Sequence, residues 1–301
     1  MTTTAMLIKQ LREATYASFL DCSNALKAHD GDYDKALEQL RASGLRKADK
    51  VADRETLDGL IVVGQTERSV CAIELNCETD FVARTQEFRS FAHCVVEQVL
   101  GDPALTDAER VLAADYIDAP GQTVAMVVKE LAGKLGENIQ LGRVARYEQG
   151  AASVLEGYIH AGAIDGYGPM EGRAGVLVEL GVEDPAAVND SAALQALAHD
   201  LALQIASDCP RYVSIADIPA EELDEQRQEF AAQLANQDKP DAIKARIIEG
   251  QLNKFYRQTC LLSQDYVKEP DLTVEGLLQQ AGAEIGSPVA VVRFARFELN
   301  T

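Results

Sequence analysis

The segment Val70-Cys71-Ala72-Ile73-Glu74-Leu75 decides the fold class of this 301-residue chain. A short run rich in β-branched and apolar side chains, bounded by polar residues, is typical of a buried β-strand. An earlier run, Leu60-Ile61-Val62-Val63, has the same character, and a polar turn over 64–68 separates the two. The pair predicts two antiparallel strands joined by that turn. A helix is expected next, over 86–100, because apolar residues recur there at helical spacing.

The strand–strand–helix unit occurs twice, and this repetition organises the chain. Three pairs of matching segments carry it: Leu57-Asp58-Gly59 with Leu155-Glu156-Gly157, Ala72-Ile73-Glu74-Leu75 with Leu177-Val178-Glu179-Leu180, and Phe88-x-x-Phe91-Ala92-His93 with Leu194-x-x-Leu197-Ala198-His199. We therefore expect core repeat 1 over 57–150 and core repeat 2 over 151–219. Because one copy cannot cover both faces of its strands, the two copies should pack together as an α+β core with antiparallel sheets.

Residues 1–45 predict a separate small module of three helices. Apolar residues follow a helical stripe from Met6 onward, Asp21 can cap a second helix, and Asp32 can start a third helix that ends at Gly44. The charged segment 46–56 has no apolar period, which is typical of a linker or a solvated helix. We expect the boundary between this module and the core to lie in that segment.

Residues 220–258 interrupt the repeat. Leu223, Phe230 and Leu234 recur at spacings of seven and four, and a second apolar stripe runs from Ile243 to Tyr256. Two helices with narrow apolar seams predict a helical hairpin, a short antiparallel coiled coil that projects from the body. Strand-like residues return near the end of the chain. The hairpin is therefore expected to be an insertion, and 259–301 should complete the core sheet.

Composition restricts the possible partners and the location of the protein. The formal net charge is -20 and the sequence pI is about 4.6, which opposes binding to nucleic acid or to an anionic membrane surface. No apolar run approaches the ~20 residues of a membrane-spanning helix, and the first residues show no secretion signal. The six cysteines form no C-x-x-C pair, which indicates free buried thiols in a reducing compartment. A cytoplasmic protein is expected.

The sequence offers few candidates for catalysis. The four histidines share no metal-ligand spacing, and the two that end the repeated helix motif occupy equivalent places, which favours structural roles. Cys71 and Cys77 are expected to be buried and lack an activating neighbour. The segments 133–136 and 172–175 do not match a phosphate loop and are interpreted as turns. We therefore expect no enzymatic activity, no metal site, no cofactor and no small-molecule substrate.

The loop after the repeated strand differs between the two copies. Copy one continues Asn76-Cys77-Glu78-Thr79-Asp80-Phe81-Val82, whereas copy two continues Gly181-Val182-Glu183-Asp184-Pro185-Ala186. Only the first loop contains a large aromatic residue, and Phe81 on such a surface loop can be an exposed anchor for a partner. Alternatively, Thr79 caps a helix and Phe81 folds inward, which is the commoner arrangement on residue chemistry alone.

The same loop, Thr79-Asp80-Phe81-Val82, resembles the signature of the elongation factor Ts family. Further similarities follow in the same order along 5–299: Asp21-Cys22-x-x-Ala25-Leu26, Gly31-Asp32, Gly136-Glu137-Asn138-Ile139 with Arg143-Val144, Tyr158-x-His160, Gly175-Val176-Leu177-Val178, Lys239-Pro240, Glu249-Gly250 and Arg293-Phe294. Each motif is weak alone, but the colinear set is highly specific. One loop departs from the family, because Thr15-Tyr16-Ala17-Ser18 stands where Thr-Gly-Ala-Gly is usual.

This resemblance implies a guanine-nucleotide exchange factor for elongation factor Tu, with a UBA-like N-terminal module and no cofactor. The Asp80-Phe81 loop would enter the partner's GTPase domain near its Mg²⁺ and phosphate site, with Phe81 as a wedge and Asp80 as a hydrogen-bonding group. GDP would then leave, so that GTP can bind. The residues that the resemblance assigns to partner contacts are Thr79, Asp80, Phe81, Val82, Phe19, Leu20, Leu135, Gly136 and His160.

Two other classes of function stay open. An adaptor that binds ubiquitin-like proteins would need only residues 1–45, but it leaves the duplicated core unexplained. An enzyme with a catalytic cysteine would require a reactive thiol, which a thiol reagent would reveal.

Overall fold

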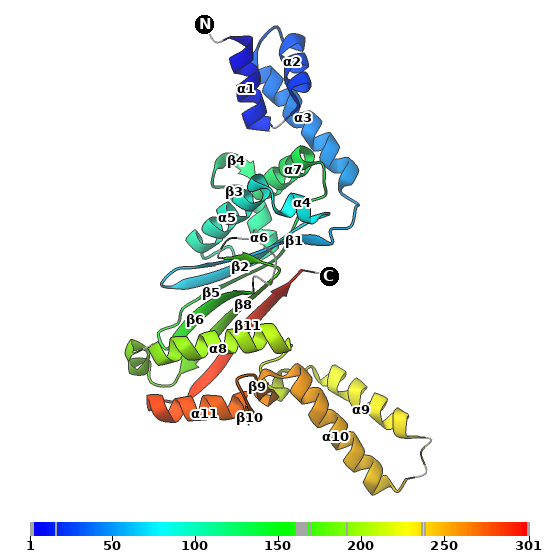
Figure 1. Ribbon diagram of the computed structural model, residues 1–301, viewed down its shortest axis with the longest axis vertical. Coiled ribbons are helices and arrows are strands. Elements are labelled where there is room, and N and C mark those ends of the chain that lie inside the picture. Colours follow the sequence, from blue (N-terminus) through cyan, green and yellow to red (C-terminus); the bar gives the residue numbers. More distant parts are fainter. Residues whose placement is uncertain are drawn as a thin grey trace.

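The computed structural model describes residues 3–15, 17–160, 168, 170–190, 192–235, 237 and 239–299. Tyr16, in the loop over 15–18 that differs from the family pattern, lies outside these ranges. The molecule is elongated, with a helical module at one end, a mixed body in the middle and a helical hairpin at the other end (Figure 1). The predicted α+β fold with antiparallel sheets is confirmed.

The N-terminal module contains three helices: α1 (Thr4–Thr15), α2 (Phe19–Ala28) and α3 (Tyr33–Val51). Asp32 caps α3 as predicted, because its side chain accepts the Lys35 backbone N–H at 3.1 Å. The predicted cap of α2 is wrong: Ser18 caps it by accepting the Asp21 backbone N–H at 3.1 Å. The small core of the module is made by Ile8, Leu11, Cys22, Ala25, Leu26, Ala36 and Leu40.

The third helix does not end at Gly44 as predicted but continues to Val51, so the first part of the expected linker is helical. Helix α3 packs closely against α7 (Val124–Leu135). A Cβ at Gly133 would lie 2.2 Å from the Gly44 carbonyl oxygen, so the two backbones touch there. The glycines allow this close helix contact, and the interpretation of 133–136 as a turn holds only for Gly136.

The first half of the body consists of β1 (Asp58–Gln65), β2 (Ser69–Cys77), α4 (Asp80–Ala83), α5 (Gln86–Gly101), α6 (Ala108–Ala113), β3 (Asp115–Tyr116), β4 (Ala119–Thr123), α7 and β5 (Gln140–Glu148). Strand β2 pairs antiparallel with both β1 and β5. Helix α5 packs on β1 and β2 and α6 packs on β5, and Phe88, Val95 and Leu131 share one buried core with Leu60 and Ile73. The predicted strand–turn–strand–helix order is confirmed.

The second half repeats this plan with β6 (Ser153–His160), β8 (Ala174–Val182), η1 (Pro185–Asp190), α8 (Ala192–Asp208), η2 (Ile215–Asp217), α9 (Ala220–Ala235), α10 (Asp241–Thr259), η3 (Leu261–Ser263), β9 (Asp265–Tyr266), β10 (Glu269–Thr273), α11 (Val274–Ile285) and β11 (Val289–Glu298). The strand order is β11-β8-β6. The short strand β7 (Glu171–Gly172) joins the first sheet instead, beside β1. Gly172 and Gly175 therefore lie in strands, so the interpretation of 172–175 as a turn is wrong.

The duplication extends beyond the three pairs of matching segments found in the sequence. Segment β9–β10–α11–β11 follows α8 and the hairpin as β3–β4–α7–β5 follows α5. Equivalent ion pairs mark the match: Arg143 Nε lies 2.7 Å from a Glu74 oxygen, and Arg293 Nε lies 2.7 Å from a Glu179 oxygen. Within the described residues, 259–299 therefore continue copy two in addition to completing its sheet.

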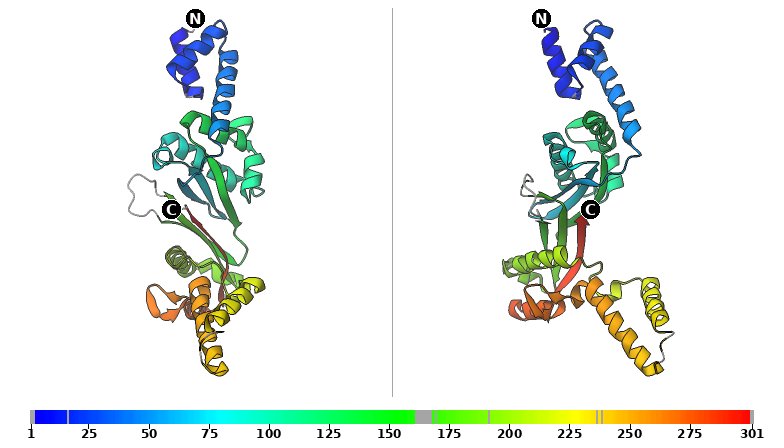
Figure 2. Two further views of the ribbon diagram at one scale, coloured as in Figure 1. Left: turned by 90° about the vertical axis from the view of Figure 1, so that its right-hand side faces the viewer. Right: turned by 45° about the vertical axis from the view of Figure 1, so that its right-hand side comes forward.

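The two sheets pack face to face, as predicted for the two copies. Their common interior contains Ile61, Val63, Val70, Ala72, Tyr147, Leu155, Leu177, Phe297 and Leu299. A Cβ at Gly157 would lie 2.7 Å from side-chain atoms of Val63 and Val70, so a glycine is needed for this approach. The layers run helices, sheet, sheet, helices along the molecule (Figures 1 and 2).

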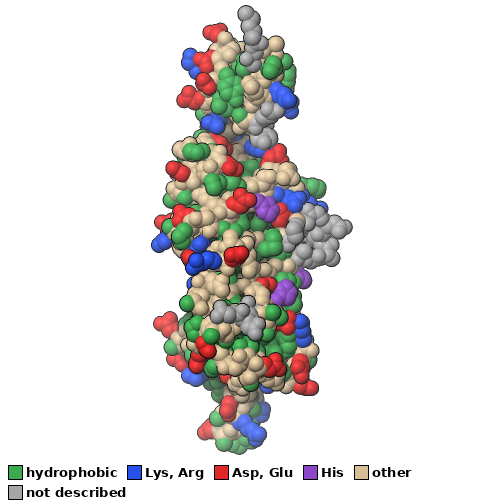
Figure 3. Space-filling model, turned by 90° about the vertical axis from the view of Figure 1, so that its left-hand side faces the viewer, with side chains coloured by type: hydrophobic (Ala, Val, Ile, Leu, Met, Phe, Trp, Pro, Cys, Tyr) green, Lys and Arg blue, Asp and Glu red, His purple; other side chains and the backbone are tan. Residues whose placement is uncertain are grey.

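Helices α9 and α10 form the predicted hairpin and project from the end of the body (Figure 1). Leu234 is buried in the thin apolar seam of the hairpin. Ile243 was expected in the same seam but is 50% exposed. Within the described ranges, no helix combines the length and apolar character needed to cross a membrane. Acidic and basic side chains are intermixed along the face drawn in Figure 3.

Candidate functional site

The loop that follows β2 carries the most exposed large hydrophobic side chain among the described residues. Phe81 is 81% exposed and lies in α4, a single helical turn. Its neighbours Val82 and Ala83 are 8% and 0% exposed and belong to the core of the first repeat. The buried pair anchors the turn from below, so Phe81 projects into solvent. The alternative in which Phe81 folds inward is therefore wrong, although its other half, a helix capped by Thr79, is correct.

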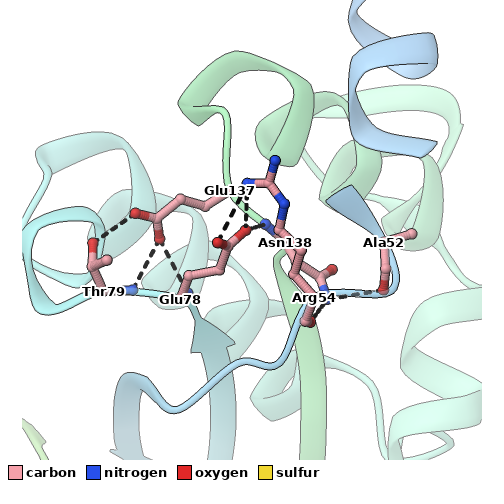
Figure 4. A network of polar contacts seen from close by, with 6 residues as sticks. All are labelled: Ala52, Arg54, Glu78, Thr79, Glu137 and Asn138. Carbon is pink, nitrogen blue, oxygen red and sulfur yellow. Dashed lines mark hydrogen bonds and ion pairs between the residues drawn. The ribbon is translucent and has the colours of Figure 1, made fainter. Parts of the chain in front are cut away.

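Thr79 is held by a carboxylate from a distant segment (Figure 4). Glu137 Oε2 accepts the backbone N–H groups of Glu78 at 3.1 Å and Thr79 at 3.0 Å, and Glu137 Oε1 accepts the Thr79 hydroxyl at 2.6 Å. The Thr79 hydroxyl oxygen in turn accepts the Val82 N–H at 3.5 Å, which caps α4. Hydrogen bonds to an ionised carboxylate are stronger than neutral ones, so the start of α4 is firmly held.

A second carboxylate, that of Glu78 in the loop, in turn accepts a hydrogen bond from the segment that carries Glu137. Glu78 Oε1 accepts the backbone N–H of Asn138 at 2.7 Å and lies 3.4 Å from Arg54. The Asn138 amide donates to the backbone oxygens of Ala52 at 3.0 Å and Arg54 at 2.6 Å (Figure 4). We call the reciprocal set Glu78, Thr79, Glu137 and Asn138 the clasp. The clasp joins the Phe81 loop, the end of α7 and the segment that follows α3.

The chain reverses at Gly136, which brings Glu137 to the Phe81 loop. Gly136 adopts a left-handed conformation, with φ of 78°, and its N–H bonds to the Ala132 oxygen at 2.8 Å, which ends α7. Glycine adopts this conformation at little cost. Leu135 is half-buried against the core, whereas Gly136 is exposed. The predicted contact residues Leu135 and Gly136 therefore stand directly before the clasp.

The remaining side chains of the loop are polar or buried. Asp80 pairs with Arg84 at 3.0 Å on the surface, a type of pair that contributes little to stability. Below the loop, the Cys77 thiol donates to the Thr79 oxygen at 3.2 Å. Burial raises the pKa of Cys77 to about 12, and burial likewise raises the pKa of Cys71 to about 12. Neither thiol is activated as a nucleophile, because the thiolate is the reactive form.

The other predicted contact residues lie elsewhere. Phe19 and Leu20 are 60% and 66% exposed at the start of α2 in the N-terminal module. His160 is exposed at the end of β6, where its Nδ1 lies 3.1 Å from the Tyr158 hydroxyl. The structure does not bring these three residues to the Phe81 loop, and Val82 is packed in the core.

The structural roles predicted for two histidines are supported by their contacts. His93 Nε2 lies 2.5 Å from Glu171, and His199 Nδ1 lies 2.7 Å from Glu156. In the part of the chain that the structure describes, no group of three or more His, Cys, Asp or Glu side chains is placed to hold a metal ion. All six cysteines are free; four are buried, Cys94 is half-buried and Cys209 is exposed, which corrects the expectation that all are buried.

Sequence reasoning missed the residues that fix the loop: Glu78, Glu137, Asn138 and Arg54. Glu137 and Asn138 belong to the motif Gly136-Glu137-Asn138-Ile139, which does not reveal their contact with the loop. One signal was available, because Glu137 in copy one stands where copy two has Ser287, just after the equivalent glycines Gly136 and Gly286.

Comparison with known proteins identifies the family. A family model described as "Elongation factor TS" matches residues 78–301. Similar proteins named "Elongation factor Ts" occur in Aquifex aeolicus, with 39% identity over 97% of this chain and 96% of the relative, and in Bdellovibrio bacteriovorus, with 38% identity over 100% and 93%. A third, from Clostridium novyi, is 36% identical over 98% and 92%. The chain belongs to the elongation factor Ts family.

Proposed function

We propose that this protein is a guanine-nucleotide exchange factor that acts on elongation factor Tu in the cytoplasm. Membership of the elongation factor Ts family supports the role in translation elongation. The observation that supports the acting residue is the 81% exposure of Phe81 on a loop whose two ends are held by the clasp and by buried Val82. A large aromatic side chain in this position adds little to folding, so it is available for a partner.

In the proposed mechanism, Phe81 inserts between helices of the partner's GTPase domain near the bound Mg²⁺ and phosphates. The displaced groups then hold Mg²⁺ and GDP less tightly, and GDP leaves. Asp80 hydrogen-bonds partner backbone, which requires it to exchange or share its pair with Arg84. The protein supplies no cofactor and breaks no covalent bond, so the reaction is a change of binding equilibria.

The size of the effect follows from the exposed side chain. Full burial of a Phe side chain contributes about 1.5–3 kcal/mol, which corresponds to roughly 10- to 150-fold in affinity. Linkage makes the effect reciprocal: if this protein weakens GDP binding by a given factor, GDP weakens the binding of this protein equally. GTP binding then completes the cycle by releasing the factor.

Further contacts belong to the same proposal. The UBA-like module of residues 1–45, with Phe19 and Leu20, would bind the nucleotide domain beside the Phe81 loop. The second repeat with His160, and the hairpin acting as a coiled coil, would hold the other end of the partner. Leu135 and Gly136 would border the contact because they lead into the clasp.

The test is GDP release from elongation factor Tu, followed with a fluorescent GDP analogue. The native protein should accelerate release, and Phe81→Ala should lower the acceleration by roughly 10- to 100-fold without changing unfolding by more than about 0.5 kcal/mol. Ile117→Ala is a matched control, because Ile117 is a 55% exposed apolar residue outside the proposed contacts. No acceleration by the native protein would refute the function, and an undiminished rate for Phe81→Ala would refute the assigned residue.

A further inference from the structure

The internal duplication provides a built-in comparison for the clasp. Position 137 in copy one corresponds to 287 in copy two, and 78–79 correspond to 183–184. In copy two, Ser287 Oγ accepts only the Asp184 N–H, at 3.0 Å, and the Glu183 N–H goes to the Pro288 oxygen at 3.3 Å. In both copies, the residue after the helix-ending glycine accepts hydrogen bonds from the loop that follows the repeated strand, and we call this contact the junction. In copy two the acceptor is one hydroxyl with one donor, whereas in copy one it is a carboxylate with three donors.

The reverse contact is also confined to copy one. Asn138 donates its backbone N–H to Glu78 at 2.7 Å, whereas Pro288, the equivalent residue, has no N–H to donate. Copy two also has Ala186 where copy one has Phe81. The stronger junction therefore accompanies the exposed aromatic side chain. A junction needed only for folding of the repeat would be expected in both copies.

We propose that Glu137 is a positioning residue for Phe81: its carboxylate fixes the start of α4, so that the aromatic ring is presented to the partner in one orientation. This inference rests on the proposed exchange function. Glu137 lies behind the loop and acts through Thr79, whose hydroxyl it binds at 2.6 Å and whose oxygen caps α4. Preorganisation of this kind removes the cost of ordering the loop when the partner binds.

The carboxylate is the chemical feature on which positioning depends. Its two oxygens accept three hydrogen bonds from Glu78 and Thr79, all from groups within two adjacent residues. Alanine would leave all three donors without this acceptor. Glutamine keeps one acceptor oxygen for the two backbone N–H groups but faces the Thr79 hydroxyl with an NH₂ group, which cannot accept. A graded loss from glutamate through glutamine to alanine is therefore expected.

The experiment combines Glu137→Ala with Phe81→Ala and measures the maximal rate of GDP release from elongation factor Tu. Glu137→Ala alone should lower this rate roughly tenfold, and Glu137→Gln should lower it less. In the Phe81→Ala background, Glu137→Ala should change the rate by less than about twofold, because no ring remains to be positioned. Ser287→Ala is the matched control in copy two and should leave the rate unchanged in both backgrounds.

Amide hydrogen exchange on the free protein provides a second readout. Exchange at Thr79 and Val82 should accelerate in Glu137→Ala, whereas in Ser287→Ala these amides should behave as in the native protein. A native rate of GDP release for Glu137→Ala, or the same tenfold loss with and without Phe81, would overturn the proposal. If Glu137→Ala does not fold, Glu137→Gln decides by the same two criteria.

Failure of the two proposals can be told apart. If the native protein does not accelerate GDP release, the exchange function is wrong, and the inference that rests on it falls with it. If the native protein accelerates release and Glu137→Ala does so equally, only the positioning role of Glu137 is wrong.

Discussion

Helices α3 and α7 touch at Gly44 and Gly133, and we predict that alanine at these two positions changes the stability of the protein in opposite directions. A Cβ at Gly133 would stand 2.2 Å from the Gly44 oxygen and 2.6 Å from the Gly44 carbonyl carbon, both backbone atoms. A Cβ at Gly44 would meet nothing within 4 Å. The alanine variants therefore differ only in which side of the same contact receives the methyl group.

The magnitudes follow from two competing effects. Alanine improves helix propensity over glycine by about 1 kcal/mol at either position. At Gly133, a carbon–oxygen contact must lengthen by roughly 1 Å or more to reach an ordinary separation, and such overpacking costs about 1–3 kcal/mol. Gly44→Ala should therefore stabilise the protein by up to about 1 kcal/mol, and Gly133→Ala should destabilise it by up to about 2 kcal/mol.

The assay is urea denaturation of both variants and the native protein, with hydrogen exchange in α3 and α7 to locate the change. Gly250→Ala is a control, because Gly250 is a helical glycine in α10 with nothing within 4 Å of a Cβ. It should resemble Gly44→Ala. If Gly44→Ala and Gly133→Ala shift the denaturation midpoint in the same direction, the close backbone contact is refuted as the reason for these glycines.

Two further predictions concern buried titratable groups. Burial lowers the pKa of Lys134 to about 8, against 10.5 ordinarily, although Glu87 lies 3.8 Å away. The folded state therefore binds this proton less tightly than the unfolded state. As the pH rises from about 8 to 10.5, the free energy of unfolding of the native protein should increase relative to that of Lys134→Met, as measured by urea denaturation. Identical pH profiles for the two proteins would contradict this. In native protein, a maleimide reagent should modify exposed Cys209 at least about 100-fold faster than buried Cys71 and Cys77, as followed by mass spectrometry; comparable rates would contradict their burial.

Local pattern was sufficient for most elements of the core. Strands β1 and β2 contain short apolar runs, and α5 has a helical stripe, so local pattern predicts the type of all three elements and the extent of α5, whereas both strands are longer than their apolar runs. The repeated segments also predicted that two sheets would pack together. By contrast, the end of α3 was misplaced, because Gly44 has the sequence signature of a helix stop while its role depends on Gly133 in another helix.

The candidate site likewise has features that local sequence predicts and features that depend on distant segments. The asymmetry between the two loops indicated Phe81, but its exposure depends on Val82 and Ala83 filling the core below it, which the loop sequence alone does not reveal. Local pattern could not predict the clasp, and only the comparison of Glu137 with Ser287 in copy two pointed to it. Glu137 lies just before β5 and reaches Thr79 because β5 pairs with β2, and in a chain rich in carboxylates no local pattern distinguishes this one.

The hairpin leaves and re-enters the body at almost one point. The Tyr212 N–H donates to the Thr259 oxygen at 3.0 Å, and the Leu261 N–H donates to the Tyr212 oxygen at 2.9 Å. A segment whose two ends are already joined by backbone hydrogen bonds can be shortened, lengthened or exchanged with little loop-closure cost to the body. The hairpin is therefore a replaceable appendage: its length can evolve, or be engineered, independently of the duplicated core and of the loop that carries Phe81.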